Sequence, residues 1–204
     1  MNSEIKQVEK RFLGQWVLAT SIGWPVGVFL AFLLSYGVVN LFYPKETNLI
    51  VGLCLGAGVG YSQWHIINKY FKISAWWIWA SAIGIGLPFV VEVLLVELGG
   101  VEYGLLNDIL GTFITGVIGG LLIGLLQINV VKSLSKKGIW WIFISPLAWG
   151  ISWLSTEIAE VVGFFIIGGV ILGAITGFAF LWLLKFPVQG DIDKAEPSKT
   201  SSTI

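Results

Sequence analysis

The sequence has few charged side chains. Lys, Arg, Asp and Glu make up 12% of the 204 residues, against about 25% in an average soluble domain. Hydrophobic residues make up 56%, and the chain holds 26 glycines and 11 tryptophans. Glycine is enriched in membrane helices and tryptophan at bilayer interfaces. This composition indicates a chain that lies in lipid. The formal net charge is zero, and we expect no nucleic-acid partner.

Residues that bind metals or carry out catalysis are also scarce. Cys54 is the only cysteine and His65 the only histidine, so an internal disulfide and a Cys/His metal site are both excluded. The sequence contains no G-x-S-x-G elbow, no H-E-x-x-H pair and no Walker loop. We therefore expect no catalytic residues, no metal site and no enzymatic activity. Nothing in the sequence indicates a cofactor.

Long apolar runs dominate the chain instead. A helix needs about 20 apolar residues to cross a bilayer, and six segments are predicted to do so. They predict an all-α integral membrane protein of six transmembrane helices (residues 12–185), with a cytoplasmic N-terminal segment (1–11) and a disordered cytoplasmic tail (186–204). The segments are Phe12–Val38, Leu49–Ile67, Trp76–Val96, Ile109–Val131, Trp140–Ile158 and Phe164–Leu184.

The basic residues predict the orientation. With the exception of Lys45, every Lys and Arg falls before the first segment, after the last, or in the loops that share their side. Because cytoplasmic loops carry an excess of Lys and Arg, we expect both termini to be cytoplasmic. The expected location is a bacterial inner membrane, either the cell membrane or a thylakoid membrane, with the lipid bilayer as one partner.

Three helical hairpins resemble one another, over about 12–67, 76–131 and 140–184. Their first helices begin with Trp16, Trp77 and Trp141, followed seven residues later by Gly23, Gly84 and Ala148. Their second helices carry glycines at four-residue spacing, and Gln63 and Gln127 follow three residues after the last glycine, where the third copy has Phe180. These glycine ladders are Gly52, Gly56 and Gly60; Gly116, Gly120 and Gly124; and Gly169, Gly173 and Gly177.

A four-residue spacing places the glycines of one ladder on one stripe of a helix. Such a stripe allows a neighbouring backbone to approach closely, so we expect the second helices of the hairpins to meet each other, or their hairpin partners, along the ladders. The alternative is a pore lined by small residues. Gln63 and Gln127 are expected to serve packing and interfacial anchoring, or else to line an entrance.

This pattern resembles a group of bacterial multi-pass proteins associated with cyanobacteria and related phototrophs. Their helices pair a W-x6-G start with a G-x3-G-x2-Q finish. The matching segments run from Trp16 to Gly23, 56–63, 77–84 and 120–127. The third copy departs from the pattern at Ala148 and Phe180. The resemblance implies a topology and no particular chemistry.

Four glutamates near the outer side are candidates for binding a cation or a proton. Glu92 and Glu157 occupy nearly equivalent positions in two copies, about one turn below the outer surface, and Glu97 and Glu160 lie near them in sequence. Ionisable residues inside a membrane are costly and often functional, and oxygen ligands suit hard cations. The alternative is that water and neighbouring helix ends satisfy these carboxylates.

Two functions remain open. The favoured one is an accessory or structural subunit that binds another membrane complex or a lipid-soluble pigment, because catalytic residues are missing and polar groups near the membrane midplane are scarce along the chain. The alternative is a small transporter or channel for cations or protons, built as a homo-oligomer around the outer glutamates.

Overall fold

The computed structural model describes residues 3–35, 47–99, 109–158 and 166–188, and it confirms an all-α architecture. Six α-helices and one short 3-10 helix make up the regular structure of this described part. They are α1 (Ser3–Leu34), α3 (Thr47–Phe71), α4 (Trp76–Gly99), α5 (Ile109–Leu134), η3 (Gly138–Trp140), α6 (Trp141–Ile158) and α8 (Gly168–Leu184).

The helices have the lengths and apolarity of membrane spans. Four stretches are long and apolar enough to cross a bilayer, and they are Gln7–Leu34, Asn48–Phe71, Ile109–Leu134 and Gly138–Thr156. Trp76–Val91 and Gly168–Leu184 are shorter apolar helical stretches. Large apolar side chains such as Leu18, Phe29 and Phe143 lie on the outside of the bundle, which in water would be costly. The chain is therefore a helical membrane protein.

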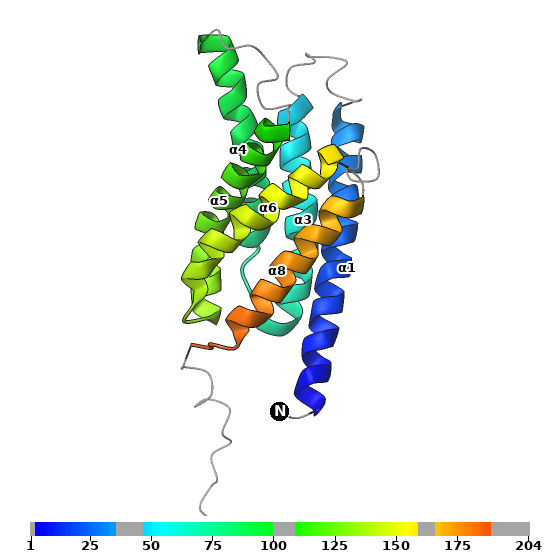
Figure 1. Cartoon of the computed structure of the whole chain (residues 1–204), viewed down its shortest axis with the longest axis vertical. Coiled ribbons are helices and arrows are strands. Elements are labelled where there is room, and N and C mark those ends of the chain that lie inside the picture. Colours follow the sequence, from blue (N-terminus) through cyan, green and yellow to red (C-terminus); the bar gives the residue numbers. More distant parts are fainter. Residues whose placement is uncertain (1–2, 36–46, 100–108, 159–165, 189–204) are drawn as a thin grey trace, which may run out of the picture.

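The six α-helices form a closed bundle in which successive helices run in opposite directions (Figure 1). Each helix packs against its neighbours in chain order, and α8 packs against both α6 and α1, which closes the ring. The start of α1 and the end of α8 lie at the same end of the bundle, the lower end in Figure 1. We call this the N-terminal end.

Several sequence expectations fall where the chain turns. Helix α1 already begins at Ser3, so residues 3–11 continue the first apolar helix. Residues 100–108 and 159–165, which lie at junctions between predicted segments, and most of the expected tail lie outside the described residues. At the N-terminal end, Ser135 connects two turns, because its Oγ donates a hydrogen bond to the carbonyl of Leu183 at 2.7 Å.

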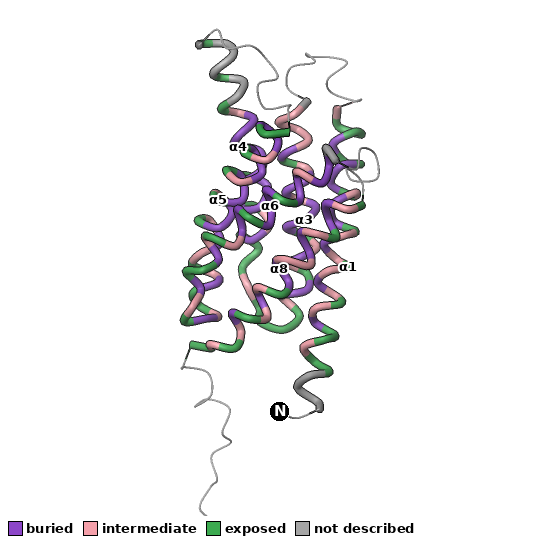
Figure 2. Tube along the Cα trace, viewed as in Figure 1, coloured by how far each residue is buried: buried purple, intermediate pink, exposed green. Residues whose placement is uncertain are grey.

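Buried residues lie along all six helices (Figure 2). They form two core layers, and both are rich in tryptophan. Trp16, Trp77 and Trp141 are buried in the layer nearer the N-terminal end, and Trp24, Trp149 and Trp153 are buried in the other. Six of the 11 tryptophans are thus inside the bundle. The sequence did not predict that these six side chains pack inside the bundle.

Candidate functional site

The most distinctive feature of the interior is a layer of tryptophan and glutamine side chains. Trp16 and Trp77 are fully buried, Trp141 and Phe180 are 1% exposed, and Gln127 is 0% exposed. Gln63 completes the set at 4%. We call these six residues the Trp–Gln layer. Because they come from all six α-helices, the layer fills the cross-section of the bundle near its N-terminal end.

Gln127 on α5 joins three helices through its amide. Its Oε1 accepts a hydrogen bond of 2.9 Å from the indole Nε1 of Trp141 on α6. Its Nε2 donates to the hydroxyl of Ser81 on α4 at 3.0 Å, and more weakly to the carbonyl of Trp77 at 3.4 Å. A buried amide that uses both its donor and its acceptor avoids the cost of an unsatisfied polar group in a low-dielectric interior.

Gln63 on α3 makes the corresponding contacts one hairpin earlier. Its Oε1 accepts from the indole of Trp77 at 3.4 Å, and its Nε2 donates to the hydroxyl of Thr20 at 3.5 Å. In both cases the tryptophan follows the glutamine by 14 residues. In both cases a hydroxyl residue four positions after the hairpin's first tryptophan, Thr20 or Ser81, accepts from the amide.

The third position of the layer is different because Phe180 replaces the amide. Its ring stacks on Trp16 with centroids 5.3 Å apart, and it meets Trp77 and Trp141 edge-on at 6.3 and 5.9 Å. The indole of Trp16 donates instead to the hydroxyl of Thr176, one turn earlier on α8, at 3.0 Å.

Ser145 is the counterpart of Thr20 and Ser81, four residues after Trp141. It is 1% exposed, and its Oγ has no hydrogen-bond partner within the described part of the chain. Residue 180, which stands where the other two hairpins have Gln63 and Gln127, is a phenylalanine and has no side-chain amide to donate to this hydroxyl.

The glycine ladders form close contacts in one consistent direction. The ladder of α3 lies against α4, that of α5 against α6, and that of α8 against α1. A Cβ atom added at Gly120 would lie 2.6 Å from the Cα of Pro146, and one added at Gly173 would lie 3.0 Å from the Cα of Val17. The backbones therefore approach to a distance that leaves no room for a side chain.

The expectation that the ladders meet each other, or their own hairpin partners, was wrong. Within the first hairpin, the contact uses Gly58, which lies against Gly23 and Gly27 on α1. Gly58 is two residues from Gly56 and Gly60, hence about 200° around the helix from them. Helix α3 therefore presents one glycine face to its own hairpin partner and its ladder to the next hairpin.

The interior of the described bundle contains polar side chains but no buried ionisable ones. Buried Thr, Ser or Gln residues occur on all six helices. Most of the hydroxyls bond within their own helix, as Ser152 does to the carbonyl of Ala148 at 2.6 Å. Such hydroxyls can sit in an apolar core without a ligand.

The candidate glutamates do not belong to this layer. Glu92 and Glu97 lie on the second half of α4 and Glu157 near the end of α6, and only the backbone is described at these three positions. Glu160 lies outside the described residues. In the part of the chain that is described, no group of three or more His, Cys, Asp or Glu side chains is placed to hold a metal ion. The predicted acidic cluster stays a prediction.

The sequence indicated the Trp–Gln layer only in part. The repeated tryptophans and glutamines were visible, but their mutual contact was not, because each indole reaches the amide of the preceding hairpin. Thr20, Ser81 and Thr176 were missed, although Thr20 and Ser81 stand four residues after the repeated tryptophans. Comparisons with protein-family models, with curated proteins and with solved structures find no match for this chain.

Proposed function

We propose that this chain is a non-conducting accessory subunit of a membrane assembly, with both termini in the cytoplasm. The observation that carries the proposal is the Trp–Gln layer. Large rings and neutral amides fill the cross-section of the bundle near its N-terminal end, and their polar atoms bond to one another and to neighbouring hydroxyls rather than facing an open path. A channel or transporter instead needs polar groups that stay available to the transported ion.

The outer surface is consistent with this role. Apolar side chains of all six helices are exposed, including Trp79 at 63%, Phe178 at 63% and Phe143 at 59%. Such a surface suits contact with lipid tails, with a lipid-soluble pigment, or with the helices of another membrane protein. Aromatic side chains supply large contact areas at low cost in side-chain entropy.

We further propose that the bundle consists of three repeated hairpins arranged around one axis. Three regularities support this: the two equal Trp-to-Gln spacings, the glycine ladders that all face the following hairpin, and the packing of α8 on α1. The third repeat has lost its glutamine, and the unpartnered hydroxyl of Ser145 marks the place where that amide would bind.

The accessory role is tested by the native mass of the protein after gentle extraction from its own membranes. Co-purification with other membrane proteins at fixed stoichiometry would support it. A monodisperse monomer or small homo-oligomer would count against it, and ion flux in proteoliposomes would then be measured. If flux were present in wild-type vesicles and abolished in a Glu92→Gln and Glu157→Gln double variant that still folds, the transport alternative would replace the proposal.

The orientation is tested separately by cysteine labelling in a Cys54→Ser background. Ser133 is exposed at the N-terminal end of the bundle, whereas the sequence places Lys45 on the opposite side of the membrane. An impermeant maleimide applied to intact cells is expected to label Lys45→Cys and to leave Ser133→Cys unlabelled until the membrane is opened. The reverse pattern would invert the topology.

A further inference from the structure

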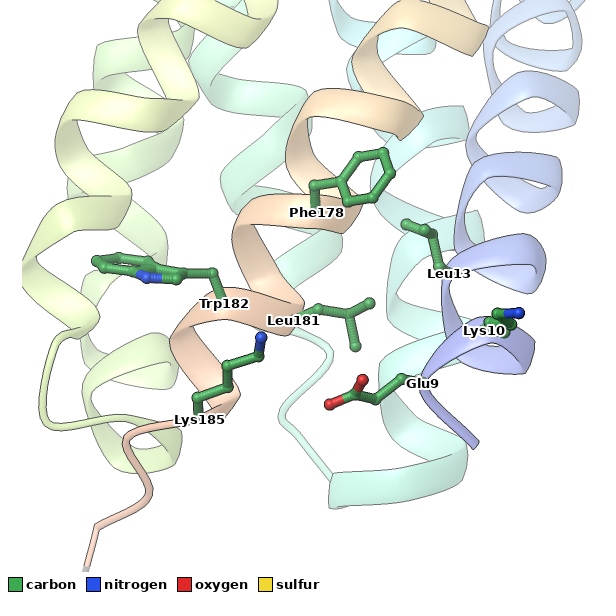
Figure 3. Close-up of a pocket in the computed structure, with 7 residues that line it drawn as sticks. All are labelled: Glu9, Lys10, Leu13, Phe178, Leu181, Trp182 and Lys185. Carbon is green, nitrogen blue, oxygen red and sulfur yellow. The ribbon is translucent and has the colours of Figure 1, made fainter. Parts of the chain in front are cut away.

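A groove lies between the first turns of α1 and the last turns of α8, at the N-terminal end of the bundle (Figure 3). Its volume is about 380 Å³, at the lower end of the range for small-molecule sites. We call it the α1–α8 groove and define it by the residues that line it, which are Glu9, Lys10 and Leu13 on α1, and Phe178, Leu181, Trp182 and Lys185 on or next to α8.

The groove has a charged end and an apolar end. The carboxylate of Glu9 and the ammonium of Lys185 point into the space between the two helices (Figure 3). Leu13, Leu181 and Phe178 lie further along the groove, toward the middle of the bundle. Since Phe178 is 63% exposed, the apolar end opens onto the surface that faces the lipid tails.

The charges of the groove are not neutralised by each other. Within the described part of the chain, no ion pair or side-chain hydrogen bond engages Glu9, Lys10 or Lys185. Lys137 lies over the rings of Phe186 at 3.7 Å and Trp182 at 5.1 Å, and it does not line the groove. A ligand with a negative group next to a positive one would match Lys185 on one side of the groove and Glu9 on the other.

We propose that the α1–α8 groove binds the head group of a zwitterionic aminophospholipid such as phosphatidylethanolamine. The phosphate would lie beside Lys185, as basic side chains in pockets between membrane helices bind phospholipid head groups. The primary ammonium would donate to the carboxylate of Glu9. The acyl chains would continue over Leu13, Leu181 and Phe178 into the bilayer. This inference does not depend on whether the chain is an accessory subunit.

The charge pattern distinguishes this lipid from other phospholipids. Phosphatidylcholine carries a quaternary ammonium that cannot donate a hydrogen bond to Glu9. Phosphatidylglycerol carries no cation, so the carboxylate of Glu9 would lie near an anionic head group without compensation. The glutamate is therefore the residue that confers selectivity, and Lys185 attracts every phospholipid that carries a phosphate.

The test is retention of lipid by the purified full-length protein. Delipidated protein is mixed with equal amounts of phosphatidylethanolamine, phosphatidylcholine and phosphatidylglycerol with identical acyl chains, and the bound lipid is counted by native mass spectrometry. Wild-type protein is expected to retain phosphatidylethanolamine about tenfold over phosphatidylcholine, the effect of one hydrogen bond to a charged group. Equal retention of the three lipids, or a preference for phosphatidylglycerol, would overturn the proposal.

Three variants separate the roles of the charges. Glu9→Gln is expected to remove the preference for phosphatidylethanolamine while total retention persists, and Lys185→Gln is expected to weaken retention of all three lipids. Lys69→Gln is the matched control, because Lys69 is an exposed lysine at the same end of the bundle outside the groove. Each variant must stay monodisperse in size-exclusion chromatography. A folded Glu9→Gln protein that keeps the wild-type preference would refute the assignment.

Discussion

Gly120 provides the sharpest test of the packing. A Cβ atom at this position would lie 2.6 Å from the Cα of Pro146 and 2.7 Å from the carbonyl oxygen of Ser145. Both are backbone atoms, so neither can rotate away. Since carbon atoms in contact prefer separations of about 3.5–4.0 Å, Gly120→Ala forces α5 and α6 apart by about 1 Å.

The expected cost follows from two opposing effects. Overpacking of this kind costs about 1–3 kcal/mol, whereas replacing glycine by alanine inside a helix gains up to about 1 kcal/mol. Gly14 on α1 is the matched control, since a Cβ atom added there meets nothing within 4 Å. Gly14→Ala thus carries the helix-propensity gain without the overpacking, and the difference between the two variants isolates the packing.

Thermal inactivation in detergent provides the measurement. Because membrane proteins often unfold irreversibly, the half-life of monodisperse protein at a fixed temperature is the appropriate quantity. Gly120→Ala is expected to have a shorter half-life than wild type, and Gly120→Leu a shorter one still, whereas Gly14→Ala should equal or exceed wild type. A Gly120→Ala protein at least as long-lived as Gly14→Ala would refute the inference that the ladder is a helix interface.

Two further predictions concern the Trp–Gln layer. Gln127→Leu is expected to destabilise the protein because the indole N–H of Trp141 loses its acceptor. The expected loss is roughly 0.6–1.7 kcal/mol, from the average to the maximum measured for interhelical hydrogen bonds in membranes. An unchanged half-life in detergent would show that this bond contributes nothing. Phe180→Gln is expected to lose ring stacking but to gain a donor for the Ser145 hydroxyl. The substitution should therefore destabilise the protein by about 0.6 kcal/mol more in a Ser145→Ala background than in the wild type. Additive effects in this double-mutant cycle would contradict the proposed third repeat.

The sequence predicted the helical architecture well because it depends on composition. Long runs of Leu, Ile, Gly and Ala can satisfy their backbone in lipid only as helices. The sequence also predicted where two helices begin, because Trp76 and Ile109 are the first residues of both the predicted and the observed helices. The extension of α1 back to Ser3 was missed, because charged residues continue a helix as readily as apolar ones.

The sequence could not predict which helix each glycine ladder faces. A four-residue spacing fixes a stripe on one helix, but the partner depends on the order of helices around the bundle. The sequence likewise could not predict the α1–α8 groove. Glu9 and Lys185 are 176 positions apart along the chain, and only the packing of α8 on α1 brings them to one space.

The closure of the ring by α8 has a consequence for synthesis of the protein. Membrane helices leave the ribosome in chain order, and α1 is the first to enter the bilayer. Its contact surface around Val17 and Thr20 receives its partner Gly173 only when the last helix has been made. During all of that time the indole of Trp16 lacks Thr176. A chain that stops before α8 therefore leaves its first helix half-paired, in the form that quality-control proteases of the membrane would recognise.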